Sequence, residues 1–174
     1  MIINPNKNLK LIGYNNFFLE LKNLYDKNIL PNKIIFSGNS GIGKCTFAYH
    51  LINYIFSKNE NFPYDIEKRA ININNYSHKL VDNNVHPNFY LIEIKENKKT
   101  IDISQIREML NFSNKTSMSD SEKIVLIEYA PSEKIFNLNT LSPSLVLSHV
   151  PSLIISIFCS MGYPNLNGVL EGAF

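Results

Sequence analysis

The chain has 174 residues, 44% of them hydrophobic and 18% charged, and its formal net charge is +2. This apolar fraction is enough for a folded core and excludes a disordered acidic or basic tail, and the length predicts one domain of ordinary size. The near balance of charge gives no global field that attracts nucleic acid. Contact with DNA would therefore need a local basic patch or a larger assembly.

The cysteines and the first residues indicate a reducing compartment. Cys45 and Cys159 form no CxxC pair, and with four histidines in the chain they favour neither a disulfide framework nor a structural zinc site. The opening run MIINPNKNLK has no apolar segment of the kind that a secretory signal needs. We expect a cytoplasmic protein.

Two helices and a strand are predicted in the first third of the chain. Apolar side chains recur at helical spacing over Tyr14–Lys27, which predicts an amphipathic helix with Phe17 and Phe18 on its apolar face. The short apolar run Lys33–Ser37 is typical of a buried parallel strand. Lys44–Phe56 is apolar almost all round, which predicts a helix packed deeply against a sheet.

The middle of the chain continues this alternation. Ser57–Pro87 is polar and rich in asparagine, so we expect a connector with room for one short helix. Strands are predicted at Asn88–Ile94 and Lys123–Ile127, and a helix is predicted at Ile103–Phe112 with Ser104 as its N-cap. Strands that alternate with helices at this spacing predict an α/β fold, with a parallel sheet covered by helices on both faces.

The most specific motif lies between the first predicted strand and the helix that follows it. The pattern G-x-x-x-x-G-K is matched there by Gly38, Asn39, Ser40, Gly41, Ile42, Gly43 and Lys44. Glycines let the backbone turn several N–H groups inward, the helix N-terminus adds partial positive charge, and Lys44 reaches the β- and γ-phosphates. The motif predicts a phosphate-binding loop, with ATP as the candidate ligand. A glycine-rich turn without a ligand is the alternative.

The positions that would hold magnesium depart from the usual pattern. Cys45 stands where a Ser or Thr hydroxyl normally binds the ion, and a soft thiol is a poor ligand for a hard cation. Thr46 is one residue late, which rotates its side chain by about 100° around the helix. The third predicted strand ends in Glu128 and Tyr129, where an Asp and a Glu would serve hydrolysis. We therefore expect Gly38–Thr46 to bind ATP without efficient hydrolysis, and we assign no metal ligand and no catalytic residue; an empty loop kept as scaffold is the alternative.

Four segments carry a resemblance to a known family. They are residues 4–56, which include GIGKCTFAYHL, then HPN at 86–88, IDISQIR at 101–107 and IVLIEYA at 124–130. In this order they resemble the N-terminal AAA+ domain of the delta-prime subunit of bacterial DNA polymerase III, a clamp-loader component. GIGKCTFAYHL is similar to the family's GIGKATLAYRL form, in which the Ser or Thr that binds magnesium is likewise often missing.

The resemblance implies a three-layer P-loop NTPase fold with nucleotide at the carboxyl ends of the strands, and we expect the strand of the loop to lie beside the strand of Glu128. It also implies a subunit of a ring-like loader that opens the sliding clamp and places it on primed DNA. The implied partners are gamma/tau-like and delta-like clamp-loader subunits, with the clamp and primed DNA reached indirectly and no membrane. An active P-loop ATPase or nucleotide kinase, with magnesium held by Thr46 or Glu128, is the alternative function.

Residues 131–174 depart from the preceding chain and from the family's pattern. All 17 basic and 14 of the 15 acidic side chains lie at or before Lys134, and the family's LLK-x-LEEPP and SRC segments are missing. We predict an AAA+ domain over residues 1–130 and a truncated, divergent or out-of-frame C-terminal tail over 131–174, with Leu153–Cys159 as a candidate strand that completes the sheet. A membrane span over Leu145–Tyr163 is the alternative, weakened by its proline, histidine and serines.

The remaining candidates favour structural roles. His50 lies on the apolar helix after the loop and is expected to be packed rather than to bind a ligand, and His86 precedes a proline at the start of a strand. Lys95, Lys98 and Lys99 form a small basic cluster for which we expect a solvated loop; contact with DNA phosphate or an acidic neighbour is the alternative.

Overall fold

The computed structural model describes residues 4–39, 41–94, 101–115, 122–129 and 154–160. In chain order its elements are the 3-10 turn η1 (Pro5–Lys7), α1 (Asn15–Asp26), β1 (Lys33–Phe36), α2 (Lys44–Ser57), α3 (Tyr76–Asp82), β2 (Phe89–Glu93), α4 (Ile103–Asn114), β3 (Lys123–Tyr129) and β4 (Ile154–Ser160). Helices and strands alternate, which confirms the α/β class. The short helix expected in the polar connector is α3.

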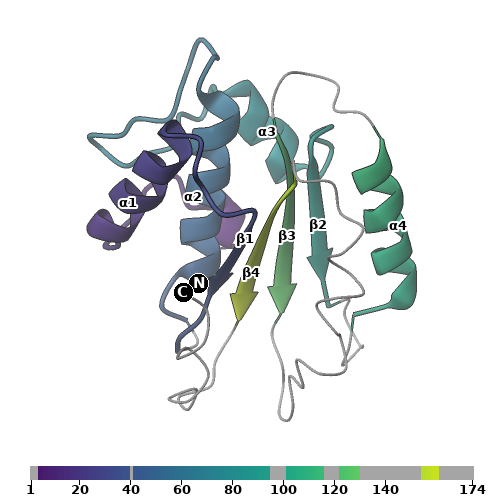
Figure 1. Ribbon diagram of the computed structural model, residues 1–174. Helices are drawn as coiled ribbons and strands as arrows, with labels where there is room; N and C mark the ends of the chain where they lie inside the picture. The colour runs from purple at the N-terminus through teal and green to yellow at the C-terminus, as the bar shows by residue number, and fades with distance from the viewer. Residues whose placement is uncertain (1–3, 40, 95–100, 116–121, 130–153, 161–174) are drawn as a thin grey trace.

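The four strands form one parallel sheet in the order β1-β4-β3-β2 (Figure 1). The strand of the loop, β1, therefore pairs with β4 and not with β3, so the prediction that it lies beside the strand of Glu128 is wrong. The reason is that β4, which comes from the apolar segment near residue 154, occupies the position between them. Because of this register Phe36, Cys159, Glu128 and Glu93 stand in one row across the carboxyl edge of the sheet.

Strand β4 also bears on the alternative of a membrane span over Leu145–Tyr163. Seven residues of that segment form a strand that pairs with β1 on one side and β3 on the other. A strand held in the middle of a sheet is not a spanning helix. Among the helices that the structure describes, none is long and apolar enough to cross a bilayer.

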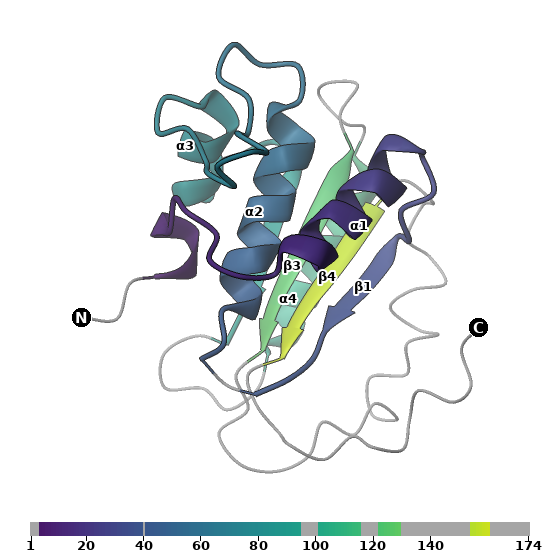
Figure 2. The same ribbon diagram turned by 90° about the vertical axis from the view of Figure 1, so that its left-hand side faces the viewer.

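Helices lie on both faces of the sheet, as predicted. Figures 1 and 2 show α1 and α2 on one face and α4 on the other. The connection from β1 to β2 crosses the sheet in one direction, and the connection from β2 to β3 returns in the other. Right-handed crossovers therefore place α2 and α4 on opposite faces.

Helix α2 lies at the centre of the larger core. All its residues except Thr46 are buried, as its almost continuous apolar sequence predicts. It packs against Phe18 of α1 on one side and against Ile124 and Leu126 of β3 on the other. A smaller core on the opposite face joins Met109 of α4 to the residues Ile92, Val125 and Ile127 of the sheet.

Helix α1 has a narrower buried face than we predicted. Phe18 is 1% exposed and packs its ring against Phe47 and Tyr54 of α2, whereas Phe17 is 63% exposed. Adjacent residues of a helix point about 100° apart, so only one of this pair can face α2. The helix is confirmed, but the placement of Phe17 on its buried face is wrong.

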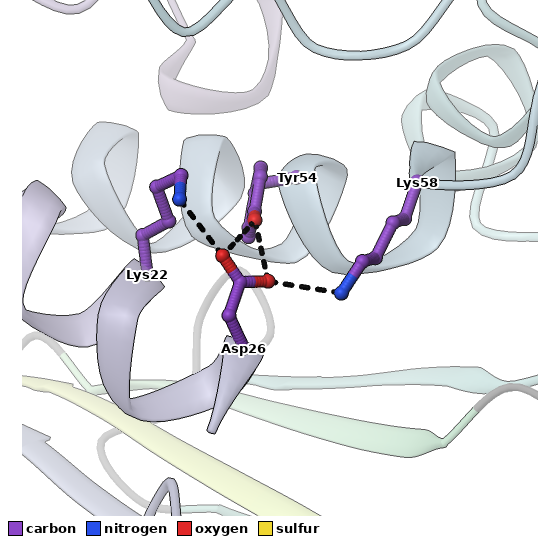
Figure 3. Close-up of polar contacts among 4 residues, drawn as sticks. All are labelled: Lys22, Asp26, Tyr54 and Lys58. Atoms are coloured by element: carbon purple, nitrogen blue, oxygen red, sulfur yellow. Dashed lines mark hydrogen bonds and ion pairs between the residues drawn. The ribbon is translucent and has the colours of Figure 1, made fainter. Parts of the chain in front are cut away.

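The C-terminal end of α1 is fastened to α2 through Asp26 (Figure 3). Its carboxylate accepts hydrogen bonds from the Tyr54 hydroxyl at 2.8 Å, from Lys22 Nζ at 2.8 Å and from Lys58 Nζ at 2.9 Å. The hydrogen bonds from Lys22 and Lys58 hold the pKa of Asp26 well below its usual range. Asp26 thus stays ionised and bridges the two helices at neutral pH.

Helix α4 begins at Ile103 as predicted, but its N-cap lies two residues before the one we predicted. Its N-cap is Asp102 and not Ser104: the Asp102 carboxylate accepts from the Ser104 backbone N–H at 3.2 Å, and the Gln105 side chain accepts from the Asp102 N–H at 3.1 Å. This reciprocal arrangement is a capping box. The spacing D-x-x-Q in the sequence carries the signal, and Ser104 already lies inside the helix.

Candidate functional site

The predicted phosphate loop lies at the carboxyl edge of the sheet, between the end of β1 at Phe36 and the start of α2 at Lys44. Gly41 has φ of 77° and Gly43, the N-cap of α2, has φ of 91°. Both values lie in the left-handed region, where a side chain would be strained. The backbone conformation therefore explains why glycine stands at these two positions. The N-terminus of α2 directly follows the loop. Ser40 lies outside the described residues.

Lys44 is held against the loop. It is 7% exposed, and its Nζ donates hydrogen bonds to the carbonyl oxygens of Gly38, at 2.8 Å, and Asn39. The ammonium group therefore lies at the loop itself rather than in solvent. A lysine in this place can bind a phosphate, because an anion that enters the loop can replace the two carbonyl groups as the hydrogen-bond acceptor of the ammonium group.

The two residues after Lys44 differ in their surroundings. Cys45 is buried with a free thiol, and Thr46 is only partly buried. The structure thus places a sulfur atom, a weak ligand for magnesium, at the first buried position of α2 after the lysine. Within the described parts of the chain, no three His, Cys, Asp or Glu side chains are grouped so that they could hold a metal ion.

The side chain of Glu128, near the end of β3, lies close to Tyr49 of α2. Burial raises the pKa of Glu128, and the Tyr49 hydroxyl near it lowers this pKa by a smaller amount. The net pKa of Glu128 is raised. Its Oε1 is buried and has no hydrogen-bond partner among the described residues. Burial, and then the charge of Glu128, raise the pKa of Tyr49, so the phenol stays neutral.

Tyr49 and Cys45 are separated by one turn, so they lie on the same face of α2. Glu93 stands in the same row across the sheet as Glu128 and is exposed. Its negative charge further raises the pKa of Glu128. The carboxyl edge of the sheet thus carries both the predicted phosphate loop and the half-buried Glu128 carboxylate, which lies near Tyr49. From the sequence we considered Glu128 as an alternative metal ligand, but we missed Tyr49. The position of Tyr49, one helical turn after Cys45, could have indicated it.

Tyr14 is a second residue that the sequence reasoning missed. Its hydroxyl donates a hydrogen bond of 2.6 Å to the carbonyl oxygen of Ile42 in the loop. Its ring lies 5.3 Å from the ring of Phe47 on α2. The start of α1 therefore touches both the loop and the helix that follows it.

The histidines have structural surroundings, as we expected. His50 is fully buried and contacts the Tyr64 hydroxyl and the carbonyl oxygen of Asn8, each at 2.9 Å. His86 is stacked on Phe56, with ring centroids 4.1 Å apart. The basic cluster of Lys95, Lys98 and Lys99 lies outside the described residues.

Comparison with known families decides the assignment of the chain. A family model described as DNA polymerase III, delta subunit, matches residues 13–141. The chain belongs to this family. The prediction of a DNA polymerase III clamp-loader relative is thereby confirmed, and the match includes α1, the phosphate loop and β3. A comparison with curated proteins finds no match. Membership links the chain to DNA replication and to the components of the clamp loader.

Proposed function

We propose that this chain acts as the delta-prime-type subunit of a bacterial clamp loader and takes part in loading the sliding clamp. The observation that carries the proposal is the family match over residues 13–141. In this proposal the fold is a three-layer AAA+ P-loop domain in the cytoplasm. Gamma/tau-like and delta-like subunits are its direct partners, and it reaches the clamp and primed DNA through them.

We infer that the site Gly38–Thr46 binds ATP and turns it over slowly or not at all. The loop conformation and the position of Lys44 support phosphate binding. Two features argue against efficient hydrolysis. Cys45 offers sulfur where magnesium prefers oxygen. Glu128, near the carboxyl end of β3, has a pKa that burial raises.

An active ATPase or nucleotide kinase is the second candidate, because the loop and Lys44 have the form that such enzymes use. It would need magnesium at Thr46 or Glu128. Metal binding by Glu128 would require its carboxylate to be ionised, which burial opposes by raising its pKa. Fast hydrolysis by the purified protein without partners, lost in Lys44→Ala, would establish this second function and overturn the first.

Equilibrium binding of a fluorescent ATP analogue, with and without magnesium, tests the nucleotide site. We expect micromolar binding that Lys44→Ala abolishes and that magnesium changes little. Lys27→Ala, which removes an exposed lysine outside the loop, is the matched control and should bind as the wild type does. Absence of binding in a folded sample would mean that the loop is kept as scaffold.

Co-purification with the gamma/tau-like and delta-like subunits of the same cell tests the assembly role. We expect a stable complex that forms with the wild type and with Lys44→Ala, since subunit contacts carry the proposed role. A chain that remains alone at micromolar concentrations of these subunits would contradict the proposal, whatever its affinity for ATP.

We further propose that residues 1–130 form the AAA+ domain and that 131–174 are a divergent or out-of-frame tail that contributes β4 to its sheet. The loss of charged residues after Lys134 and the place of β4 between β1 and β3 support this division. Residues 131–153 and 161–174 lie outside the described residues. Resequencing of the coding region tests the out-of-frame interpretation, which an intact frame with the same tail would contradict.

A further inference from the structure

The backbone at the start of α1 adopts an unusual conformation. Gly13 has φ of 78° and Tyr14 has φ of 57°, so two successive residues are left-handed. Glycine adopts this conformation freely, but a bulky aromatic residue rarely does, and the cost is of order 1 kcal/mol or more. Contacts of Tyr14 must therefore offset this cost.

The contacts of Tyr14 are with the phosphate loop and with α2. Its hydroxyl donates to the Ile42 carbonyl oxygen at 2.6 Å, and its ring packs on Phe47. A Cβ atom built on Gly43 would lie 3.9 Å from Cε2 of the Tyr14 ring. The ring therefore runs alongside the last glycine of the loop, and the hydroxyl reaches the peptide group just before it.

That peptide group joins Ile42 to Gly43, and it is trans. In a trans peptide the C=O and the following N–H point in opposite directions. A hydrogen bond that fixes the Ile42 carbonyl toward Tyr14 therefore fixes the Gly43 N–H away from it. Backbone N–H groups of this loop, together with the start of α2, are the donors that a polyphosphate would use.

We propose that Tyr14 is a positioning residue for the phosphate loop: its hydroxyl orients the peptide between Ile42 and Gly43, and so pre-organises the Gly43 N–H for the polyphosphate of a bound nucleoside triphosphate. The proposal rests on the proposed binding of ATP and adds the residue that sets the geometry of the site. It also connects α1 to the nucleotide, because the same residue begins that helix.

A purely structural role would need the ring and not the hydroxyl. The ring supplies the packing on Phe47 and the contact beside Gly43, and a phenylalanine would keep both. The hydroxyl instead serves a carbonyl group of the loop. Tyr14→Phe therefore separates packing from the orientation of the loop.

The test compares the wild type, Tyr14→Phe, Tyr14→Asn and the control Tyr76→Phe, which changes a tyrosine that is 67% exposed and distant from the loop in sequence. Asparagine tolerates the left-handed conformation but is too short to replace the tyrosine. Three quantities are measured: affinity for a fluorescent ATP analogue with inorganic pyrophosphate as competitor, the NMR shift and exchange rate of the Gly43 amide without ligand, and the urea unfolding midpoint.

We expect Tyr14→Phe to weaken ATP and pyrophosphate binding roughly three- to tenfold, the loss that corresponds to one hydrogen bond. The Gly43 amide should shift and exchange faster in both Tyr14 variants, and Tyr76→Phe should match the wild type. An unchanged Gly43 amide and unchanged affinity in a folded Tyr14→Phe protein would overturn the inference.

The two proposals can fail separately. If the wild type binds no ATP, the proposed nucleotide site fails, and the Gly43 amide alone decides whether Tyr14 orients the loop. If the wild type binds ATP and Tyr14→Phe binds equally well, the nucleotide site stands and the positioning role of Tyr14 is wrong. A lower urea midpoint without a change of the Gly43 amide would assign Tyr14 a structural role and also overturn the inference.

Discussion

At the level of single residues, the pairing of Tyr49 with Glu128 bears on whether this carboxylate could hold a metal ion. A carboxylate that holds magnesium needs free oxygen lone pairs and a low pKa. Here burial raises the pKa of Glu128, and the Tyr49 hydroxyl lowers it by a smaller amount. The Tyr49 hydroxyl partly compensates for burying the charge, so we expect Tyr49 to stabilise the fold.

This view predicts the effect of Tyr49→Phe. The substitution removes the hydroxyl near the Glu128 carboxylate and leaves this group more poorly solvated, so we expect the free energy of unfolding to fall by about 1–3 kcal/mol. Urea unfolding at neutral pH measures the change. Tyr76→Phe, at an exposed position, is the control and should change the midpoint little. Equal midpoints for both variants would mean that Tyr49 contributes no net stability through Glu128.

How much of the site the sequence reveals depends on how local the signal is. The loop motif is contiguous, so the sequence alone predicted its place between a strand and a helix. The contact between Tyr14 and Ile42 joins residues that are 28 positions apart, and no spacing rule marks it. Tyr49 lies only one turn after Cys45, but its partner Glu128 is on another element. Such pairs become visible only when the sheet is assembled.

At the level of elements, α4 shows how a helix start is chosen between two polar candidates. Ser104 and Asp102 are both residue types that favour the N-cap. Asp102 prevails because Gln105, three residues later, can accept from its backbone N–H and complete the capping box. The carboxylate also lies at the positive end of the helix dipole.

Single substitutions at Asp102 and at Ser104 distinguish the two candidate N-caps of α4. Asp102→Ala removes the acceptor for the Ser104 N–H, so we expect the free energy of unfolding to fall by about 1 kcal/mol. Ser104→Ala changes an exposed residue inside the first turn and should stay within about 0.5 kcal/mol of the wild type. Thermal or urea unfolding of both variants provides the comparison. A larger loss in Ser104→Ala would restore the original assignment of the cap.

Elements themselves were predicted well, because apolar periodicity within α1, α2, α4 and the first three strands is a local property. Their arrangement was predicted less well. Nothing in the local pattern of β1 says that β4 will be its neighbour, because parallel pairing is decided by the whole sheet. The wrong placement of Phe17 also concerns arrangement. Helical periodicity allowed either Phe17 or Phe18 to face α2, and only the packing of the two helices decides between them.

For the molecule as a whole, two buried histidines connect α2 to the segments around it. His50 donates from Nε2 to the Asn8 carbonyl, and its Nδ1 contacts the Tyr64 hydroxyl. His86 accepts at Nδ1 from the Asn88 N–H at 3.2 Å, which leaves Nε2 to face the Ser77 hydroxyl. These partners fit neutral imidazoles with the proton on Nε2. A proton on Nδ1 of His86 would oppose the Asn88 N–H.

The fold should therefore lose stability in mild acid. Burial lowers the pKa of both His50 and His86 to about 4, from 6.5. Above pH 6.5 the imidazoles are neutral in both states and add no pH dependence. As the pH falls from 6.5 toward 4, the unfolded chain binds protons that the folded chain refuses, which for His50 amounts to about 3 kcal/mol across the window.

Two half-buried carboxylates, Glu122 and Glu128, oppose part of this loss of stability. Burial raises the pKa of Glu122 and Glu128, so their protonation in the folded state opposes part of the loss. Asp26 acts later: its pKa is lowered from 3.8, and its contribution is present above that value and lost as the pH falls further. The histidines should dominate the first part of the acid transition and Asp26 the last.

NMR titration of the imidazole signals, combined with urea unfolding at about pH 7.5 and about pH 5, tests this order. We expect the signals of His50 and His86 to remain those of neutral rings to about pH 5 and the free energy of unfolding to be lower there by a few kcal/mol. Titration of either ring near 6.5 in the folded protein would contradict its buried, neutral state. If both rings stay neutral and stability still does not fall, the buried carboxylates must compensate fully. Glu128→Gln would then expose the histidine contribution, because the amide cannot take up the compensating proton.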